Sequence, residues 1–175
     1  RTQFDVTNYV IDAQLSPSEN KLTATTDVSF VPLEDTRSVS FELNGSLKVD
    51  SITRIDASTP AGPVKPPTSK AKTPATTTTP AGGITFVQDQ VGITDLGPSV
   101  RIDLGDTVTK GTPIKLRFKY SGILNTPSGG PLLTKRLAYV GDDQGYLMYA
   151  ARWFPFHDYA ADPASSDITI TTPNG

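Results

Sequence analysis

The stretch Tyr146-Leu-Met-Tyr-Ala-Ala-Arg-Trp-Phe-Pro-Phe-His-Asp158 is the most aromatic part of this chain of 175 residues. It contains the only Trp, the only His and the only Met, together with two of the seven Phe and two of the six Tyr. Burying a large apolar side chain contributes roughly 1.5–3 kcal/mol. We therefore expect this stretch to be a buried strand that turns sharply at its end.

Outside this stretch, apolar and polar residues alternate with the period of two that is typical of half-buried strands. The expected strands lie at residues 4–15, 22–30, 39–43, 47–55, 84–87, 100–104, 114–120 and 167–171. The first two flank a turn cluster and predict an antiparallel hairpin, and a break in parity between Val49 and Ile52 predicts a β-bulge. No window has a convincing helical repeat, so we predict an all-β, antiparallel fold with more than one packed sheet.

Residues 56–83 differ from the rest, with six Pro, seven Thr, three Lys and no aromatic residue. Proline cannot donate ladder hydrogen bonds, and so little apolar surface cannot offset the entropy of ordering. We predict that 57–82 is a disordered Thr/Pro-rich loop inserted between strands. It could be a tolerated surface insertion, or a glycosylated or partner-binding tether.

Composition limits the class of protein. The length predicts a single domain over 1–175, and the absence of Cys excludes disulfides and thiolate metal sites. A net charge of −2 argues against nucleic acid as a partner, and no apolar run is long enough for a membrane span. The start at Arg1 and the Thr/Pro-rich stretch predict an exported bacterial protein, periplasmic or extracellular.

Candidate chemical groups are few. The chain has no H-E-x-x-H, no nucleophile elbow and no phosphate-binding Gly-rich loop, so we assign no catalytic residue and no metal ligand. His157 beside Asp158 could act as a general base, but no nucleophile lies near it in sequence. Asp142-Asp143 lacks the spacing of a calcium loop, which favours a plain turn. Arg152 could bind a substrate carboxylate, although a structural ion pair or aromatic stacking is the better interpretation.

The order Ala151-Arg-Trp-Phe-Pro-Phe-His-Asp158 resembles the A-R-x-x-F-P-x-x-D segment of aminopeptidase-N-like zinc metallopeptidases, with one residue fewer between the Arg and the Phe. Arg152, Trp153, Phe154, Pro155 and Asp158 are the residues that carry this structural motif. Ile114-Lys-Leu-Arg-Phe-Lys-Tyr-Ser-Gly122 is similar to the family's strand ending in Y-x-G. Weaker similarities cover the first hairpin, residues 39–49 and residues 167–175, so the resemblance spans most of the chain.

The resemblance implies a saddle-shaped, sandwich-like N-terminal domain that is not catalytic itself. In the family, a C-terminal catalytic domain follows with H-E-x-x-H and a zinc ion, so zinc is expected in the parent protein, a zinc metallo-aminopeptidase, and not here. The chain would pack on its own catalytic domain and wall off the cleft that binds the amino terminus of a peptide substrate.

One family residue of this domain lines the first substrate pocket, a Gln ten positions before the motif Phe, which corresponds to Gln144 here. The family often has Glu two positions later, where this chain has Tyr146. That departure implies unusual specificity, or a parent without peptidase activity.

A free-standing extracellular β-sandwich module for binding or adhesion is the alternative function. It predicts that Trp153 and its neighbours form an exposed aromatic platform. The family resemblance predicts instead a mostly buried Trp153, and an apolar patch left bare where the catalytic domain would sit.

Overall fold

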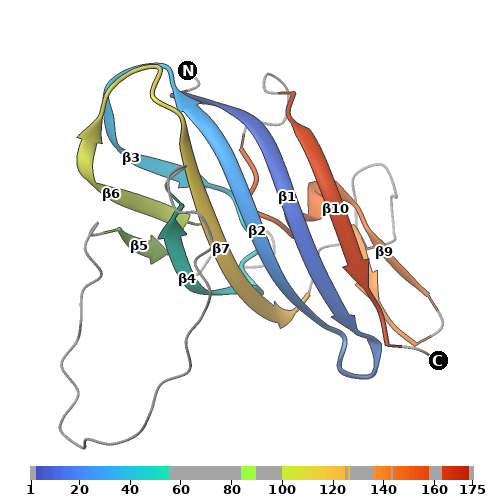
Figure 1. Cartoon of the computed structure of the whole chain (residues 1–175). Helices are drawn as coiled ribbons and strands as arrows, with labels where there is room; N and C mark the ends of the chain where they lie inside the picture. Colours follow the sequence, from blue (N-terminus) through green and yellow to red (C-terminus); the bar gives the residue numbers. More distant parts are fainter. Residues whose placement is uncertain are drawn as a thin grey trace, which may run out of the picture.

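The computed structural model describes residues 3–55, 84–89, 100–124, 126, 136–142, 144–157 and 163–173. In this part of the chain, strands form three sheets and the only helical turns are short 3₁₀ turns (Figure 1). The predicted all-β, multi-sheet class is therefore confirmed. The strands are β1 (Phe4–Ser16), β2 (Lys21–Pro32), β3 (Thr36–Phe41), β4 (Lys48–Arg54), β5 (Thr85–Gln88), β6 (Val100–Val108), β7 (Ile114–Ile123), β8 (Ala138–Val140), β9 (Gly145–Leu147) and β10 (Ser165–Thr171).

The largest sheet has five strands in the order β10-β1-β2-β7-β4. The predicted hairpin is confirmed, because β1 and β2 pair antiparallel from Phe4–Pro32 to Ser16–Lys21. The predicted bulge is confirmed as well, since the register of β4 on β7 shifts between Val49 and Ser51. The expected period of two is seen in β1, where exposed and buried side chains alternate over most of the strand.

One pairing in this sheet is parallel. β10 lies beside β1 in the same direction, with Asn8 opposite Ser165 and Gln14 opposite Thr171. A parallel neighbour needs a crossover connection, and here the rest of the domain lies between the two strands in sequence. The last strand thus joins the first at the edge of the large sheet (Figure 1).

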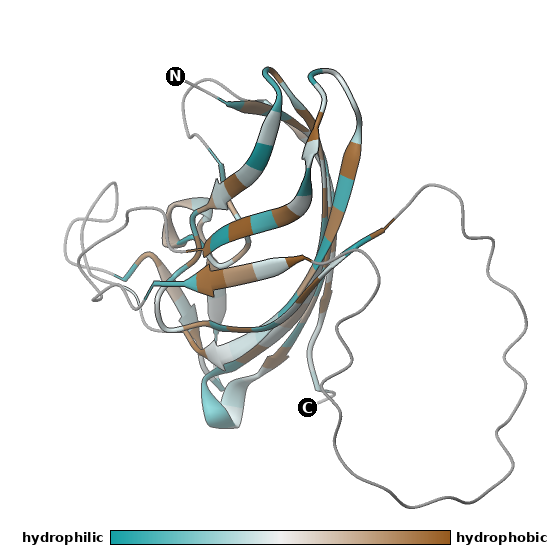
Figure 2. Cartoon of the chain, turned by 90° about the vertical axis from the view of Figure 1, so that its left-hand side faces the viewer, coloured by the Kyte–Doolittle hydropathy of each residue, from teal (hydrophilic) through white to brown (hydrophobic). Residues whose placement is uncertain are grey.

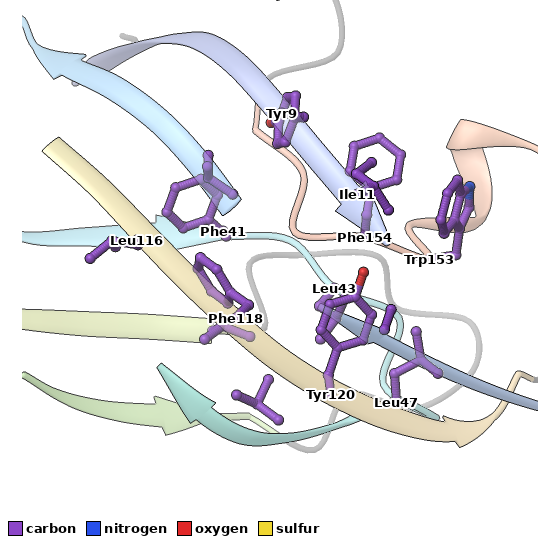
Figure 3. Close-up of a cluster of buried hydrophobic side chains, with 14 of the residues drawn as sticks. Tyr9, Ile11, Phe41, Leu43, Leu47, Leu116, Phe118, Tyr120, Trp153 and Phe154 are labelled. Atoms are coloured by element: carbon purple, nitrogen blue, oxygen red, sulfur yellow. The ribbon is translucent and has the colours of Figure 1, made fainter. Parts of the chain in front are cut away.

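The second sheet has the order β3-β6-β5 and faces the curved inner surface of the first (Figure 2). The apolar side chains of both sheets form one buried cluster. Phe41 of β3 contacts the large sheet through Phe118 of β7, with ring centroids 5.4 Å apart and nearly perpendicular, and through Phe4 and Phe30. Figure 3 shows the centre of this cluster, where Phe118 of the large sheet lies beside Phe41 of the small one, and Tyr120 lies beside Leu43 and Leu47.

Two polar features stabilise the large sheet. In the core, the hydroxyls of Thr26 and Tyr120 lie 2.9 Å apart, and burial raises the pKa of Tyr120 above its ordinary value. On the outer face, Arg117 donates to both carboxylate oxygens of Asp27, at 2.7 and 2.9 Å. This hydrogen-bonded pair raises the pKa of Arg117.

Two sequence predictions concern residues outside those described. The loop predicted at 57–82 lies there, and so the division of 1–175 into one domain and one insertion stays a prediction. Among the described residues, no helix is long and apolar enough to span a membrane.

Candidate functional site

The short hairpin of β8 and β9 carries Gln144 at its turn. The backbone NH of Gly141 donates to the carbonyl oxygen of Gln144 at 3.1 Å, which closes the turn. The Gln144 side chain is exposed. The ring of Tyr139 covers Gly141 so closely that a side chain at that position would collide with it. The glycine therefore allows a tight turn that presents Gln144 to solvent.

Tyr146 lies two residues after Gln144, in β9. It faces Tyr139 across the hairpin, and the centroids of the two rings are 6.3 Å apart. Its side chain is partly buried. Tyr146 has a phenol where a glutamate would have a carboxylate, so this position lacks the acidic group that would pair with an ammonium ion.

The aromatic stretch is not the continuous buried strand that we predicted. β9 ends at Leu147, a 3₁₀ turn occupies Tyr149–Ala151, and Arg152 adopts the left-handed conformation with φ 52° and ψ 45°. This conformation costs a non-glycine residue about 1–2 kcal/mol. The apolar content of the sequence correctly indicated burial, but it contains no signal for this reversal of the backbone.

Backbone contacts to the chain after β3 hold this reversal in place. Asn44 donates from its backbone NH to the carbonyl of Arg152 at 2.8 Å, and from its side-chain Nδ2 to that of Ala151 at 3.0 Å. Further along, Glu42 and Phe156 exchange two backbone hydrogen bonds of 2.7 and 2.8 Å. The stretch is therefore attached beside residues 42–44, through an isolated antiparallel β-bridge and the two hydrogen bonds from Asn44.

Arg152 forms an ion pair with Glu42, with Nε 2.5 Å from Oε2. The Arg152 side chain is only 19% exposed, and its Nη1 atom is buried without a hydrogen-bond partner within the described part of the chain. The structure thus places the motif arginine against a carboxylate of its own chain. Asp158, the last residue of the predicted motif, lies outside the described residues.

Trp153, Phe154 and Pro155 are buried after this turn, and Trp153 is only 4% exposed. The ring of Phe154 lies edge-on to Trp153 at 5.1 Å and to Tyr9 of β1 at 5.3 Å (Figure 3). Burial of Trp153 confirms the expectation from the family resemblance. The alternative prediction, an exposed aromatic platform at Trp153, is wrong, because these rings fill the core against β1.

His157 stacks on Phe4, with ring centroids 3.8 Å apart and planes tilted by only 19°. Phe41 approaches the same imidazole at 6.2 Å. The ring is thus packed between aromatic side chains of the core, which is a different setting from the open cleft that a general base requires. Asp158, its suggested orienting partner, is not among the described residues.

The described residues include no group of three or more His, Asp or Glu side chains that could hold a metal ion. Asp142 is exposed in the turn before Gln144, whereas Asp143 lies outside the described part. A zinc ion therefore has no fitting set of ligands among the residues described.

Sequence reasoning missed the partners of the motif. From the sequence we assigned no role to Asn44, yet Asn44 anchors the aromatic stretch and its Oδ1 also accepts from Ser46. The Y-x-G ending has a physical basis too. A side chain at Gly122 would collide with the backbone carbonyl of Ser46, so glycine is required where β7 passes that loop.

Comparison with solved structures shows similarity to M1 zinc metallopeptidases. An M1 zinc metallopeptidase mutant from Deinococcus radiodurans, bound to a Tyr-Ser-Ala substrate, superposes with a TM-score of 0.65 at 18% identity. The alignment covers 98% of this chain and 33% of that one. Another structure of an M1 zinc metallopeptidase from the same organism gives a TM-score of 0.63 at 15% identity, and the alignment covers 99% of this chain and 33% of that one.

A third structure, a two-domain M1 zinc metallopeptidase mutant bound to L-arginine, gives a TM-score of 0.62 at 17% identity and covers 98% and 33% of the two chains. Neither protein-family profiles nor curated protein sequences give a match. At such low identity, the similarity establishes the fold. The chain thus has the fold of one third of a two-domain M1 zinc metallopeptidase, which confirms, at the level of fold, the resemblance seen in its sequence.

Proposed function

We propose that this chain is the non-catalytic N-terminal domain of a zinc aminopeptidase-like protein, which packs on a C-terminal catalytic domain and walls off its substrate cleft. The observation that carries the proposal is the extent of the structural match. Nearly all of this chain aligns, yet it spans only a third of each metallopeptidase. We infer that the catalytic domain lies in the remaining two thirds of such a protein.

The zinc ion would be held by that catalytic domain, because the described residues of this chain offer no ligand set. When bound, zinc supplies a Lewis acid that polarises a peptide carbonyl and activates water. The contribution of this chain would be to position substrate and to exclude water. Removing water from the cleft strengthens each polar contact to the bound amino terminus.

Gln144 is the residue that we propose to contact the substrate. Its exposed side chain lies on a tight turn, and its amide oxygen can accept a hydrogen bond from an α-ammonium group. Tyr146 stands where many members of the family have a glutamate. With a tyrosine in place of this glutamate, we expect weaker recognition of the free amino terminus than a Gln–Glu pair would give.

The test is a peptidase assay on the full-length protein, with zinc content measured on the same sample. We expect zinc-dependent release of amino-terminal residues. Gln144→Ala should lower kcat/KM by roughly ten- to a hundredfold, because a hydrogen bond to a charged group contributes about 1.5–3 kcal/mol.

Gln14→Ala is the matched control, because Gln14 is also exposed but lies in β1 of the large sheet and not on the β8–β9 turn. It should leave kcat/KM unchanged. Full activity of the Gln144 variant would contradict the role of this residue. Absence of both zinc and activity in the full-length protein would contradict the peptidase proposal and leave a scaffold or binding domain.

We also propose that the protein is exported and of bacterial origin, which the Thr/Pro-rich composition of 57–82 favours. Fractionation of the producing cells tests this point. Recovery of the full-length protein with the cytoplasmic fraction would contradict export.

A further inference from the structure

The hairpin of β8 and β9 is a small unit that carries Gln144 in its turn. In the described part of the chain it forms a sheet of its own, with residue pairs from Ala138–Leu147 to Val140–Gly145 (Figure 1). A two-stranded hairpin that stands alone is marginally stable at best in water. Contacts from outside the hairpin must therefore fix the position of its turn.

Thr126 supplies such a contact at the start of β8. Its hydroxyl donates to the backbone carbonyl of Ala138 at 3.2 Å and accepts from the backbone NH of the same residue at 3.1 Å. Thr126 and Ala138 are 3% and 1% exposed, so solvent does not reach either bond. One hydroxyl thus satisfies both backbone groups of Ala138, as a neighbouring strand would do in a wider sheet.

The hydrogen bonds within the hairpin explain why these two backbone groups face Thr126. The NH of Met148, just after β9, donates to the carbonyl of Leu137 at 3.1 Å. The backbone groups of successive residues in a strand point alternately to its two sides. Leu137 therefore faces β9, whereas Ala138 faces away from it, toward Thr126.

The other end of the hairpin is held differently. Asn44 donates to the carbonyls of Ala151 and Arg152, beyond the 3₁₀ turn that follows β9, and its Oδ1 also accepts from Ser46 in its own loop. Replacing Asn44 would therefore disturb more than the hairpin. Within the described part of the chain, the hydroxyl of Thr126 bonds to the hairpin alone.

We propose that Thr126 is a positioning residue for Gln144. Its hydroxyl fixes the start of β8, and thereby the turn that presents Gln144 to solvent. This proposal rests on the proposed function, in which Gln144 contacts the amino terminus of a peptide. Because Thr126 is buried, it acts through the backbone of Ala138 and not by contact with the substrate.

Substitution of Thr126 in the full-length protein tests the proposal. Thr126→Val keeps the shape of the side chain but removes the hydroxyl, whereas Thr126→Ser keeps the hydroxyl. Thr26→Val is the matched control, because Thr26 is also a buried threonine, but its hydroxyl lies beside that of Tyr120 in the large sheet. Circular dichroism verifies that each variant is folded.

Hydrogen exchange followed by mass spectrometry measures the effect on the hairpin. Unsatisfied buried backbone groups raise the population of locally open states. In Thr126→Val, we expect peptides that cover β8 and β9 to exchange at least about fivefold faster than in the wild type, while the large sheet is unchanged. Thr126→Ser should exchange like the wild type, and Thr26→Val should not accelerate exchange selectively in the hairpin.

Peptidase kinetics then test whether the effect passes through Gln144. We expect Thr126→Val to lower kcat/KM by about threefold to tenfold, because a displaced turn misplaces the amide of Gln144. Thr126→Ser and Thr26→Val should retain the wild-type value. In a Gln144→Ala background, Thr126→Val should cause no further loss, since the group that it positions is already absent.

Unchanged hydrogen exchange of the hairpin in Thr126→Val would overturn the proposal. So would a loss of kcat/KM that adds in full to that of Gln144→Ala, because Thr126 would then act by another route. Failure of the proposed function is seen separately, as a full-length wild type without zinc or activity. Hydrogen exchange would in that case still decide whether Thr126 fixes the turn of Gln144.

Discussion

The buried hydroxyl pair of Thr26 and Tyr120 offers a stringent test of the core. Both side chains are essentially inaccessible to solvent, and their oxygens are 2.9 Å apart. They come from adjacent strands, β2 and β7, of the large sheet. Each hydroxyl is therefore the polar partner of the other inside an otherwise apolar layer.

Removing one member of the pair should cost more than removing both. Tyr120→Phe leaves the Thr26 hydroxyl buried without its partner, and an unsatisfied buried group costs about 1–3 kcal/mol. Thr26→Val leaves the Tyr120 hydroxyl without its partner in the same way. The double variant buries no unpaired polar group, so its free energy of unfolding should be within about 1 kcal/mol of that of the wild type.

Urea unfolding of residues 1–175 measures these differences. Trp153 is the only Trp and is buried, so its fluorescence reports on loss of the core. We expect a coupling energy of at least about 1 kcal/mol between the two substitutions in a double-mutant cycle. Single variants that are each neutral, or that add without coupling, would refute the assignment of this pair as a buried hydrogen bond.

Three further predictions concern the large sheet. Burial raises the pKa of Tyr120 above its ordinary value near 10, so the contribution of this residue to the free energy of unfolding is complete below pH 10 and is lost as the pH rises above that value. Between pH 10 and 11, the free energy of unfolding of the wild type, measured in urea, should fall by up to about 1.4 kcal/mol more than that of Tyr120→Phe. Gly122→Ala should lower the free energy of unfolding by about 1–3 kcal/mol in the same assay, since a methyl group meets backbone, and a neutral result would contradict that close approach. Arg117→Ala should cost about 1 kcal/mol, because it breaks the bidentate pair with Asp27 but the Arg117 side chain is 44% exposed. Lys119→Ala on the same strand is the control, and equal losses would show that the pair contributes nothing specific.

The strands and their faces could be predicted from sequence because the signal is local. A period of two assigns each side chain of β1 and β7 to a face, and the turn cluster between β1 and β2 leaves them only one short connection. The shift in parity after Val49 likewise marks the bulge, since one extra residue moves the side chains that follow it to the opposite face of the sheet.

The candidate site could be predicted only in part. A count from the motif Phe identifies Gln144, and the structure shows that this residue is exposed on a tight turn, while its role at a substrate stays a prediction. The partners of Arg152 were not predictable. Glu42 and Asn44 lie more than 100 residues before it, and nothing in their local pattern indicates a contact with the aromatic stretch.

The sequence by itself determined an all-β chain, the positions of most strands, the buried character of the aromatic stretch and the resemblance to zinc metallopeptidases. These properties follow from side-chain periodicity and composition, which each segment carries alone. Only the tertiary structure decided that β10 joins β1 in parallel, that Arg152 turns the backbone in the left-handed conformation, and that Ile168 and Ile170 of β10 remain exposed. Those features depend on contacts between segments distant in sequence, and a local pattern cannot specify which of several compatible strands becomes its neighbour.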